Sequence, residues 1–198
     1  MTRGSNTDDY RGVVNDDTST VTRRDALRRG AGLAVTAVGA TGVAGTAAAQ
    51  SALDGSGTEA DPYVVRTVRD LDAVRDAPSA HYELQSDIDA TGTEWTPIDE
   101  FNGTIGGGGH TIAGLSIDTD AGAGLILNAD GATVRDVKIR EATVTAVEGA
   151  GIIASEAYNT TIEDVDVTGT VTANTDAGGV IGFNESATVT NCRVDVEV

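Results

Sequence analysis

A repeat of 27 or 28 residues runs through the C-terminal part of the chain, from Gly122 to Val198. Three successive segments each open on small residues and close on alternating apolar ones. Equivalent positions are Gly124, Gly151 and Gly179; Val134, Ile162 and Val189; Val137, Val165 and Cys192; and Ile139, Val167 and Val194. Self-similarity at a fixed period of this length is typical of a solenoid, in which each unit packs only on its neighbours.

The apolar residues within each unit alternate, as in the pair Val165 and Val167, and this period of two indicates strands. No helical pattern separates the units, so strands of successive units must pair directly, in parallel and in register. The sequence therefore predicts an all-β protein, a right-handed parallel β-helix with coils stacked about 4.8 Å apart. Equivalent apolar residues form interior ladders in such a fold, and we expect Cys192 to be a small buried hydrophobe within one of them.

The segment before the repeats has the pattern of a cap. Val68, Leu71 and Val74 share one face of a short helix that Thr67 can begin as N-cap. Such a helix would cover the open end of the first coil. At the other end the chain stops at Val198 inside an alternating strand. We expect either that the repeat array is cut short there or that this end docks onto something.

Particular motifs carry a resemblance to a known repeat family. Gly178-Gly179-Val180-Ile181-Gly182, followed by Thr188-Val189-Thr190-Asn191-Cys192, resembles the GLUG repeat. Residues 58–112 resemble the segment that precedes such repeats, through Asp61-Pro62-Tyr63, Glu94-Trp95-Thr96-Pro97-Ile98 and Gly109-His110-Thr111-Ile112. The resemblance covers residues 57–198. It implies a right-handed parallel β-helix in a secreted or surface protein, including adhesin-like ones.

The first 49 residues have the pattern of an export signal. Arg23 and Arg24 precede Leu27 and resemble a twin-arginine signal. A short run of Ala, Gly, Val and Thr follows, and it ends at Ala47 and Ala49 in an Ala-x-Ala cleavage pattern. The apolar run is too short and too rich in Gly to predict a transmembrane anchor. We therefore expect export through the twin-arginine route to the cell surface or the extracellular space, with residues 1–49 as a disordered n-region plus signal peptide.

The charge balance excludes one class of partner. The chain has 13 Lys and Arg against 31 Asp and Glu, a formal net charge of −18. Nucleic acid binding needs clustered cations, so no nucleic acid partner is expected. Removal of residues 1–49 leaves 7 cations and 26 anions, a net charge of −19. This excess, dominated by Asp, is typical of halophilic proteins, since molar salt shortens the Debye length to about 3 Å.

Patterns of catalytic residues are scarce in the sequence. Asn174-Thr175-Asp176 resembles one element of a polygalacturonase site, but no partner carboxylates follow it as that chemistry requires. Arg135, Lys138 and Arg140 are interpreted as solvated outer-face charges. We predict no catalytic residues, no cofactor and no metal site. Weak cation sites remain an alternative to a solvated surface at three acidic pairs, which are Asp87/Asp89, Asp118/Asp120 and Asp164/Asp166.

The sequence also contains three N-glycosylation tripeptides, which begin at Asn102, Asn159 and Asn184. The predicted organisation is a signal in residues 1–49, a cap with the first coils in 50–121, and GLUG-like repeats in 122–198. The predicted function is an exported, non-enzymatic surface module for adhesion or envelope structure. The alternative is a β-helix that binds or degrades polysaccharide. The predicted partners are accordingly cell-envelope components or extracellular polysaccharide.

Overall fold

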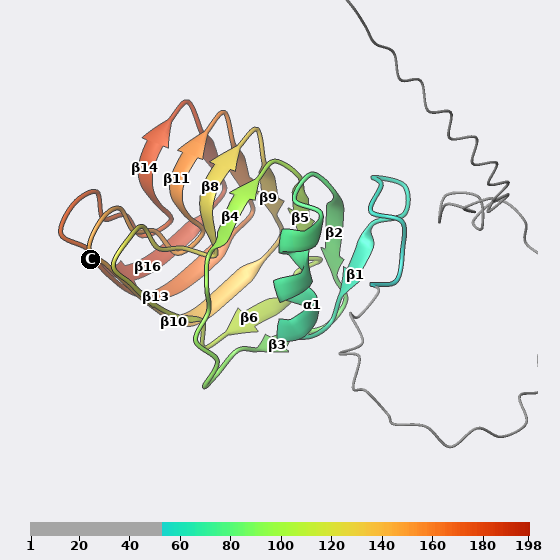
Figure 1. Ribbon diagram of the computed structural model, residues 1–198, viewed down its shortest axis with the longest axis horizontal. Helices are drawn as coiled ribbons and strands as arrows, with labels where there is room; N and C mark the ends of the chain where they lie inside the picture. The colour runs from blue at the N-terminus through green and yellow to red at the C-terminus, as the bar shows by residue number, and fades with distance from the viewer. Residues whose placement is uncertain (1–52) are drawn as a thin grey trace, which may run out of the picture. The chain divides into compact units, whose positions relative to one another are not determined.

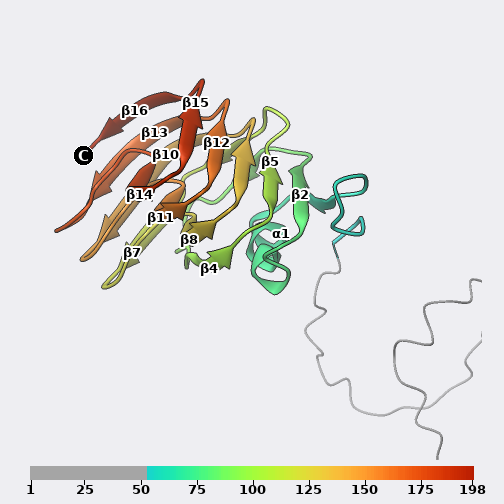
Figure 2. The ribbon, with the colours of Figure 1, turned by 90° about the horizontal axis from the view of Figure 1, so that it is seen from above.

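The fold is a parallel β-solenoid of about four turns, seen in a computed structural model that describes residues 53–198. Three parallel sheets form its sides, and the chain winds through them in the right-handed sense (Figures 1 and 2). Right-handed crossovers are the strongly preferred connection between parallel strands of one sheet. The prediction of an all-β parallel β-helix is confirmed.

Each sheet takes one strand from each coil. Sheet 1 contains β1 (Tyr63–Val65), β2 (His81–Leu84), β5 (Thr104–Gly106), β9 (Thr133–Arg135), β12 (Thr161–Glu163) and β15 (Thr188–Thr190). Sheet 2 contains β3 (Ile88–Asp89), β6 (Thr111–Ala113), β7 (Ser116–Thr119), β10 (Lys138–Ala146), β13 (Asp166–Thr172) and β16 (Arg193–Glu197). Sheet 3 contains β4 (Ile98–Phe101), β8 (Ile126–Asp130), β11 (Ala154–Tyr158) and β14 (Ile181–Glu185).

The interior ladders follow the register that the repeats predict. Ile139 pairs with Val167, and Val167 pairs with Val194. In sheet 1 the ladder of Val134, Ile162 and Val189 is equally in register. Ile139 and Val167 are fully buried between neighbouring coils. The core is therefore a stack of β-branched side chains running along the axis of the solenoid.

Two of the three corners of each coil are only two residues long. Sheet 3 connects to sheet 1 through such corners, and from β9 onward sheet 1 connects to sheet 2 in the same way. The first residue of each corner has a left-handed backbone, and these residues are Gly131, Asn159 and Ser186 at one corner and Asp136, Asp164 and Asn191 at the other. Asn and Asp tolerate this conformation better than other side-chain-bearing residues, so glycine is not the general solution here.

The second residue of each two-residue corner points inward. Val137 and Val165 occupy this place between sheets 1 and 2, and each is only 1% exposed. Cys192 is their equivalent in the last coil, where it packs against the core but is half-buried. Its thiol donates to the Thr190 carbonyl oxygen at 3.2 Å. The predicted ladder is thus present, with Cys192 less buried than expected.

The third corner, between sheets 2 and 3, absorbs the differences in repeat length. Its four connections span residues 90–97, 120–125, 147–153 and 173–180. Ala150 lies opposite Ala177. The next residue, Gly151, therefore matches Gly178 and not Gly179, as the sequence alignment had it. The unit spacing is 27 residues at Ala123 and Ala150 but 28 at Ile126 and Ala154, because one extra residue lies in this corner.

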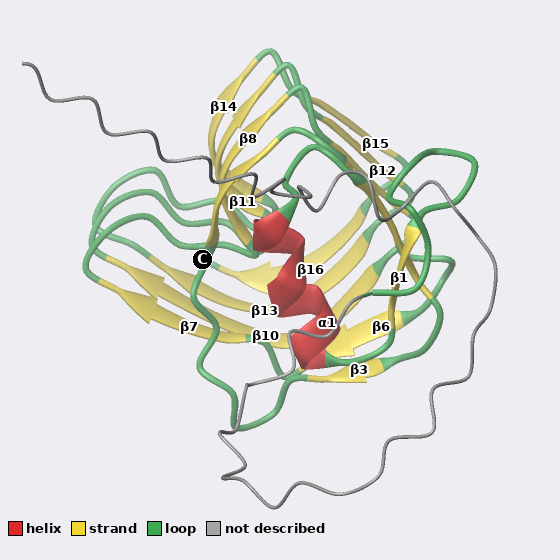
Figure 3. Ribbon diagram, turned by 45° about the vertical axis from the view of Figure 1, so that its right-hand side comes forward, coloured by secondary structure: helices red, strands yellow, loops and turns green. Residues whose placement is uncertain are grey.

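The N-terminal end is closed by the predicted helix. Helix α1 (Val68–Asp72) continues into a 3-10 turn, η2 (Ala73–Asp76). Thr67 and Asp70 form a reciprocal capping box at its start, which satisfies two free backbone N–H groups. Leu71 and Val74 are fully buried under it. Figure 3 shows the helix lying across the end of the first coil, which confirms the predicted cap.

The opposite end presents the edges of all three sheets. Strands β14, β15 and β16 each have a paired neighbour on one side only. Side chains in ladder positions are consequently exposed there, with Val189 at 42% and Val194 at 48%. Among the described residues the large apolar side chains that are exposed gather mostly in this last coil, and they are Phe183, Val189, Val194 and Val198.

An ion pair links neighbouring coils on the outside of sheet 2. Arg140 donates to both carboxylate oxygens of Asp166, at 2.7 and 2.5 Å. Arg140 is therefore a paired residue rather than the solvated charge that the sequence suggested. The hydrogen bond from Arg140 is the main cause that lowers the pKa of Asp166 below its ordinary value. A carboxyl with a lowered folded-state pKa stabilises the fold above its unfolded pKa and loses that contribution as the pH falls.

We expect Asp166→Asn to lower stability at neutral pH by less than about 1 kcal/mol, because the pair is partly exposed. The variant should also lose part of the stability decrease that wild type shows as the pH falls below about 4, the ordinary range of an Asp carboxyl. Thermal melts between neutral pH and pH 2 measure both effects. Asp164→Asn is the matched control, since Asp164 is exposed at a left-handed corner that Asn tolerates. Parallel pH profiles for wild type and Asp166→Asn would contradict a role for this carboxylate.

Candidate functional site

Sheet 3 carries two columns of outward-facing side chains. Glu100, Asn128, Glu156 and Phe183 are in register on neighbouring strands and form one column. Asp130, Tyr158 and Glu185 form the second column, two residues farther along each strand. The columns arise because the unit spacing repeats the same rung position in every coil. Each column runs along the solenoid axis and combines carboxylate, amide and aromatic groups.

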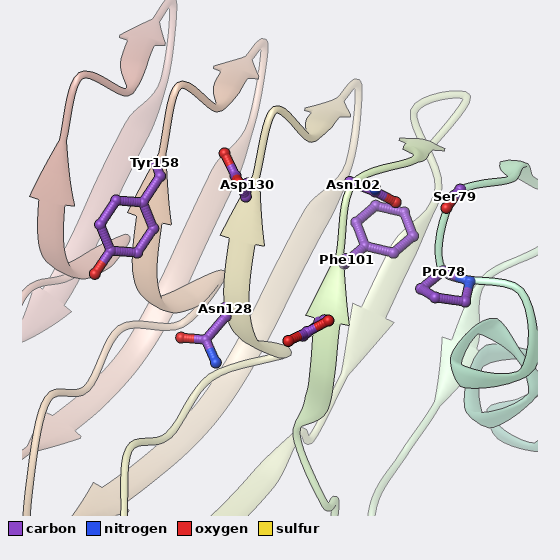
Figure 4. A pocket seen from close by; sticks show the side chains of 8 residues that line it. Pro78, Ser79, Phe101, Asn102, Asn128, Asp130 and Tyr158 are labelled. Atoms are coloured by element: carbon purple, nitrogen blue, oxygen red, sulfur yellow. The ribbon is translucent and has the colours of Figure 1, made fainter.

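A depression lies at the N-terminal end of these columns. Its volume is about 400 Å³, and it is lined by Pro78, Ser79, Glu100, Phe101, Asn102, Asn128, Asp130 and Tyr158. Figure 4 shows Asn128, Asp130 and Tyr158 on neighbouring strands, with Pro78 and Ser79 on the segment after the cap. A second depression of about 670 Å³ shares Pro78, Glu100 and Asn128 and extends toward Arg75 and Asp99. We call the two together the sheet-3 groove.

Tyr158 is held in place beside the groove. Its hydroxyl donates to a carboxylate oxygen of Glu156 at 2.7 Å, and this hydrogen bond raises the pKa of the phenol above its ordinary value. The ring of Tyr158 also contacts the ring of Phe183, with centroids 6.1 Å apart and a tilt of 51°. The phenol is thus protonated at neutral pH, and its ring is braced from two sides.

The groove is negatively charged. Glu100 and Asp130 line it, and Asp99 and Glu156 flank it. Arg75 is the cation among its lining residues, and other contacts already hold it. Its guanidinium bonds Asp72 at 2.8 Å and the Thr96 carbonyl at 2.9 Å, and it lies 5.6 Å from the Trp95 ring centroid. The groove therefore offers hydrogen-bond acceptors, one amide that both donates and accepts, and an aromatic edge.

The acidic pairs considered as cation sites lie apart from the groove, and their oxygens bond to the protein. Asp87 accepts from the Thr111 N–H at 2.8 Å, and Asp89 accepts from the Thr91 N–H at 2.9 Å. These bonds are the largest or among the largest causes that lower the pKa of both carboxyls. Within residues 53–198 no group of three or more His, Cys, Asp or Glu side chains is placed to hold a metal ion.

The glycosylation tripeptides fall in two different settings. Asn102 and Asn159 are exposed and open the same two-residue corner, between sheets 3 and 1, in different coils. Asn184 lies within β14 opposite the buried Ala157, and its side-chain oxygen accepts from the Ala187 N–H at 2.8 Å. Arg23, Arg24, Leu27, Ala47 and Ala49, the predicted signal residues, lie outside the described part of the chain.

The groove residues were not identified from the sequence, although a signal for them exists. Glu100, Asn128 and Glu156 are spaced by 28 residues, as are Asn102, Asp130 and Tyr158. Extending the repeat alignment upstream to β4 would have placed them in two columns. The sequence reading instead weighed aromatic residues by number, and most of those lie near the cap.

Comparison with known proteins gives relatives that are much longer than this chain. No family model matches the sequence. Halomucin of Haloquadratum walsbyi is 33% identical over 196 residues, which is 88% of this chain and 2% of halomucin. A "putative Gly-rich membrane protein" of Evansella cellulosilytica is 36% identical over 80 residues, 34% of this chain and 9% of that protein. The chain thus spans only a small fraction of the relatives it matches.

One solved structure shares the architecture. A crystal structure described as a "putative immunoglobulin A1 protease" from Bacteroides ovatus superposes with a TM-score of 0.57. The match has 21% identity and covers 70% of this chain and 48% of the other. At this level of identity the likeness concerns the fold. The described residues contain no helix with the length and apolar character that crossing a membrane requires.

Proposed function

We propose that the chain is an exported, non-enzymatic module of the cell surface or extracellular space, with a role in adhesion or envelope structure. The observation that carries the proposal is the similarity to halomucin over 88% of the chain, combined with a parallel solenoid fold. A solenoid presents a long, regular outer surface whose side chains change without disturbing the interior ladders. The GLUG-like motifs and the N-terminal signal pattern support the same role.

The surface chemistry of the solenoid fits an extracellular, salt-rich setting. Within residues 53–198 the buried polar side chains are Ser155 and Thr160, so no Asp or Glu of this part is buried. Acidic side chains therefore lie on the outside of all three sheets. The tripeptides at Asn102 and Asn159 are exposed at a corner, and glycosylation at them stays a prediction.

Export is testable by changing the two arginines of the signal. We expect the double variant Arg23→Lys, Arg24→Lys to accumulate as an unprocessed precursor in the cytoplasm of a host with a twin-arginine pathway. Wild type should appear outside the cytoplasm, cleaved near Ala49. Cell fractionation and N-terminal sequencing measure both results. The double variant Arg28→Lys, Arg29→Lys has the same charge and should be exported normally. Normal secretion of the first variant would contradict the twin-arginine route.

A further inference from the structure

We propose that the sheet-3 groove binds a chain of neutral sugars that lies across strands β4, β8 and β11. The inference deepens the proposed surface role by naming the partner class of one site. It rests on the two overlapping depressions, on the residues that repeat along them, and on the sign of their charge.

The dimensions of the groove suit an extended ligand. Its two parts have volumes of about 400 and 670 Å³, within the range of small-molecule sites. They share Glu100 and Asn128 and so form one furrow. Equivalent side chains recur on each strand at intervals of about 4.8 Å. A polymer of repeating units, lying along the solenoid axis, would meet a similar set of groups at each coil.

The lining chemistry matches sugar hydroxyls. A hydroxyl donates and accepts, and the Glu100 and Asp130 carboxylates accept while the Asn128 amide does both. Asn128 is half-buried at the centre of the furrow, where both depressions meet. Tyr158 adds an apolar ring at one side, and its hydroxyl is already held by Glu156. The ring is thus a fixed surface against which the C–H groups of a sugar can pack.

The charge of the groove selects among glycans. Uronic-acid or sulfated polymers would bring anions beside Glu100 and Asp130, and Arg75 is already paired with Asp72. A cationic peptide would suit the charge, but its attraction would be screened over about 3 Å in molar salt. Hydrogen bonding and ring packing to a neutral sugar depend less on ionic strength. A neutral glycan is therefore the ligand favoured by the whole set of groups.

Isothermal titration calorimetry of the purified full chain in molar KCl tests the proposal. The probes are cellohexaose, xylohexaose, mannohexaose and laminarihexaose, with hexagalacturonate and hexalysine as charged comparators. We expect at least one neutral hexasaccharide to bind. Asn128→Ala and Tyr158→Ala should each weaken its binding about tenfold, the loss of one good contact. Tyr158→Phe should retain most of the affinity, because the hydroxyl faces Glu156.

Thr143→Ala, an exposed change on sheet 2, is the matched control and should bind as wild type. A thermal melt of each variant shows whether it is folded, and Glu100→Gln replaces Asn128→Ala if the latter is not. The proposal is overturned if no neutral hexasaccharide binds, if only a charged comparator binds, or if the groove variants bind as wild type. Because purified protein is used, these outcomes are independent of whether the chain is exported.

Discussion

Transfer from molar KCl to about 0.1 M is expected to unfold or loosen the solenoid. Residues 53–198 carry 7 cations and 26 anions, and none of their Asp or Glu side chains is buried. Along the strands an acid often faces Asn, Tyr, Thr or Arg on the next coil, as Glu100 and Glu156 face Asn128. Like charges are then about 9.6 Å apart, two strand spacings. The Debye length is about 10 Å at 0.1 M and about 3 Å at 1 M, so only molar salt screens them.

The repulsion is thus the sum of many moderate terms, with closer approaches at a corner where Asp136 and Asp164 are equivalent in neighbouring coils. The net stability of a domain is only about 5–15 kcal/mol, so such a sum is enough to shift the balance. Circular dichroism melts across a KCl series measure it, and NaCl should give the same midpoints. A midpoint that does not change with salt would contradict the prediction. Recovery of the fold by millimolar calcium alone would indicate specific cation sites instead.

The second large effect is expected from Val144→Asp. Val144 is fully buried in the interior ladder of sheet 2, in register with Val171 and Ile117. A carboxylate there would have no partner in a dry stack of apolar side chains, and we expect a loss of several kcal/mol in the free energy of unfolding. This is a large part of the total, so the variant should be partly or fully unfolded at room temperature.

Thr143→Asp provides a closely matched control in the adjacent position. Thr143 is exposed, and its register partners on the next strands are Ser116 and Thr170. The same new charge on the outside should cost little in molar salt. Chemical denaturation followed by circular dichroism compares the two variants. Equal midpoints for both would mean that the inward and outward sides of β10 have been assigned wrongly.

The interior of the fold was predictable because the sequence repeats it. Ladders such as Ile139, Val167 and Val194 require the same rung position in each coil, and parallel pairing then follows from the absence of helices between the units. The cap was predictable for a local reason, since Thr67 and the spacing of Leu71 and Val74 depend on a few neighbouring residues.

The corners and the groove were less accessible to sequence reasoning. Left-handed residues at Asp136 and Asp164 are not marked by glycine, so the corners could not be located by composition. The groove depends on residues from three coils and on the segment at Pro78, which the repeat pattern does not include. A site assembled across coils is visible only when the register is known to the residue.

The unequal corners have a consequence for how such a protein can change over time. A corner of two residues, with one left-handed and one buried position, accepts almost no insertion without breaking a ladder. The connections at 90–97, 120–125, 147–153 and 173–180 already differ in length, and the coils still stack. New segments are therefore tolerated along one edge of the solenoid, and variation there can add loops while the remaining two edges preserve the scaffold.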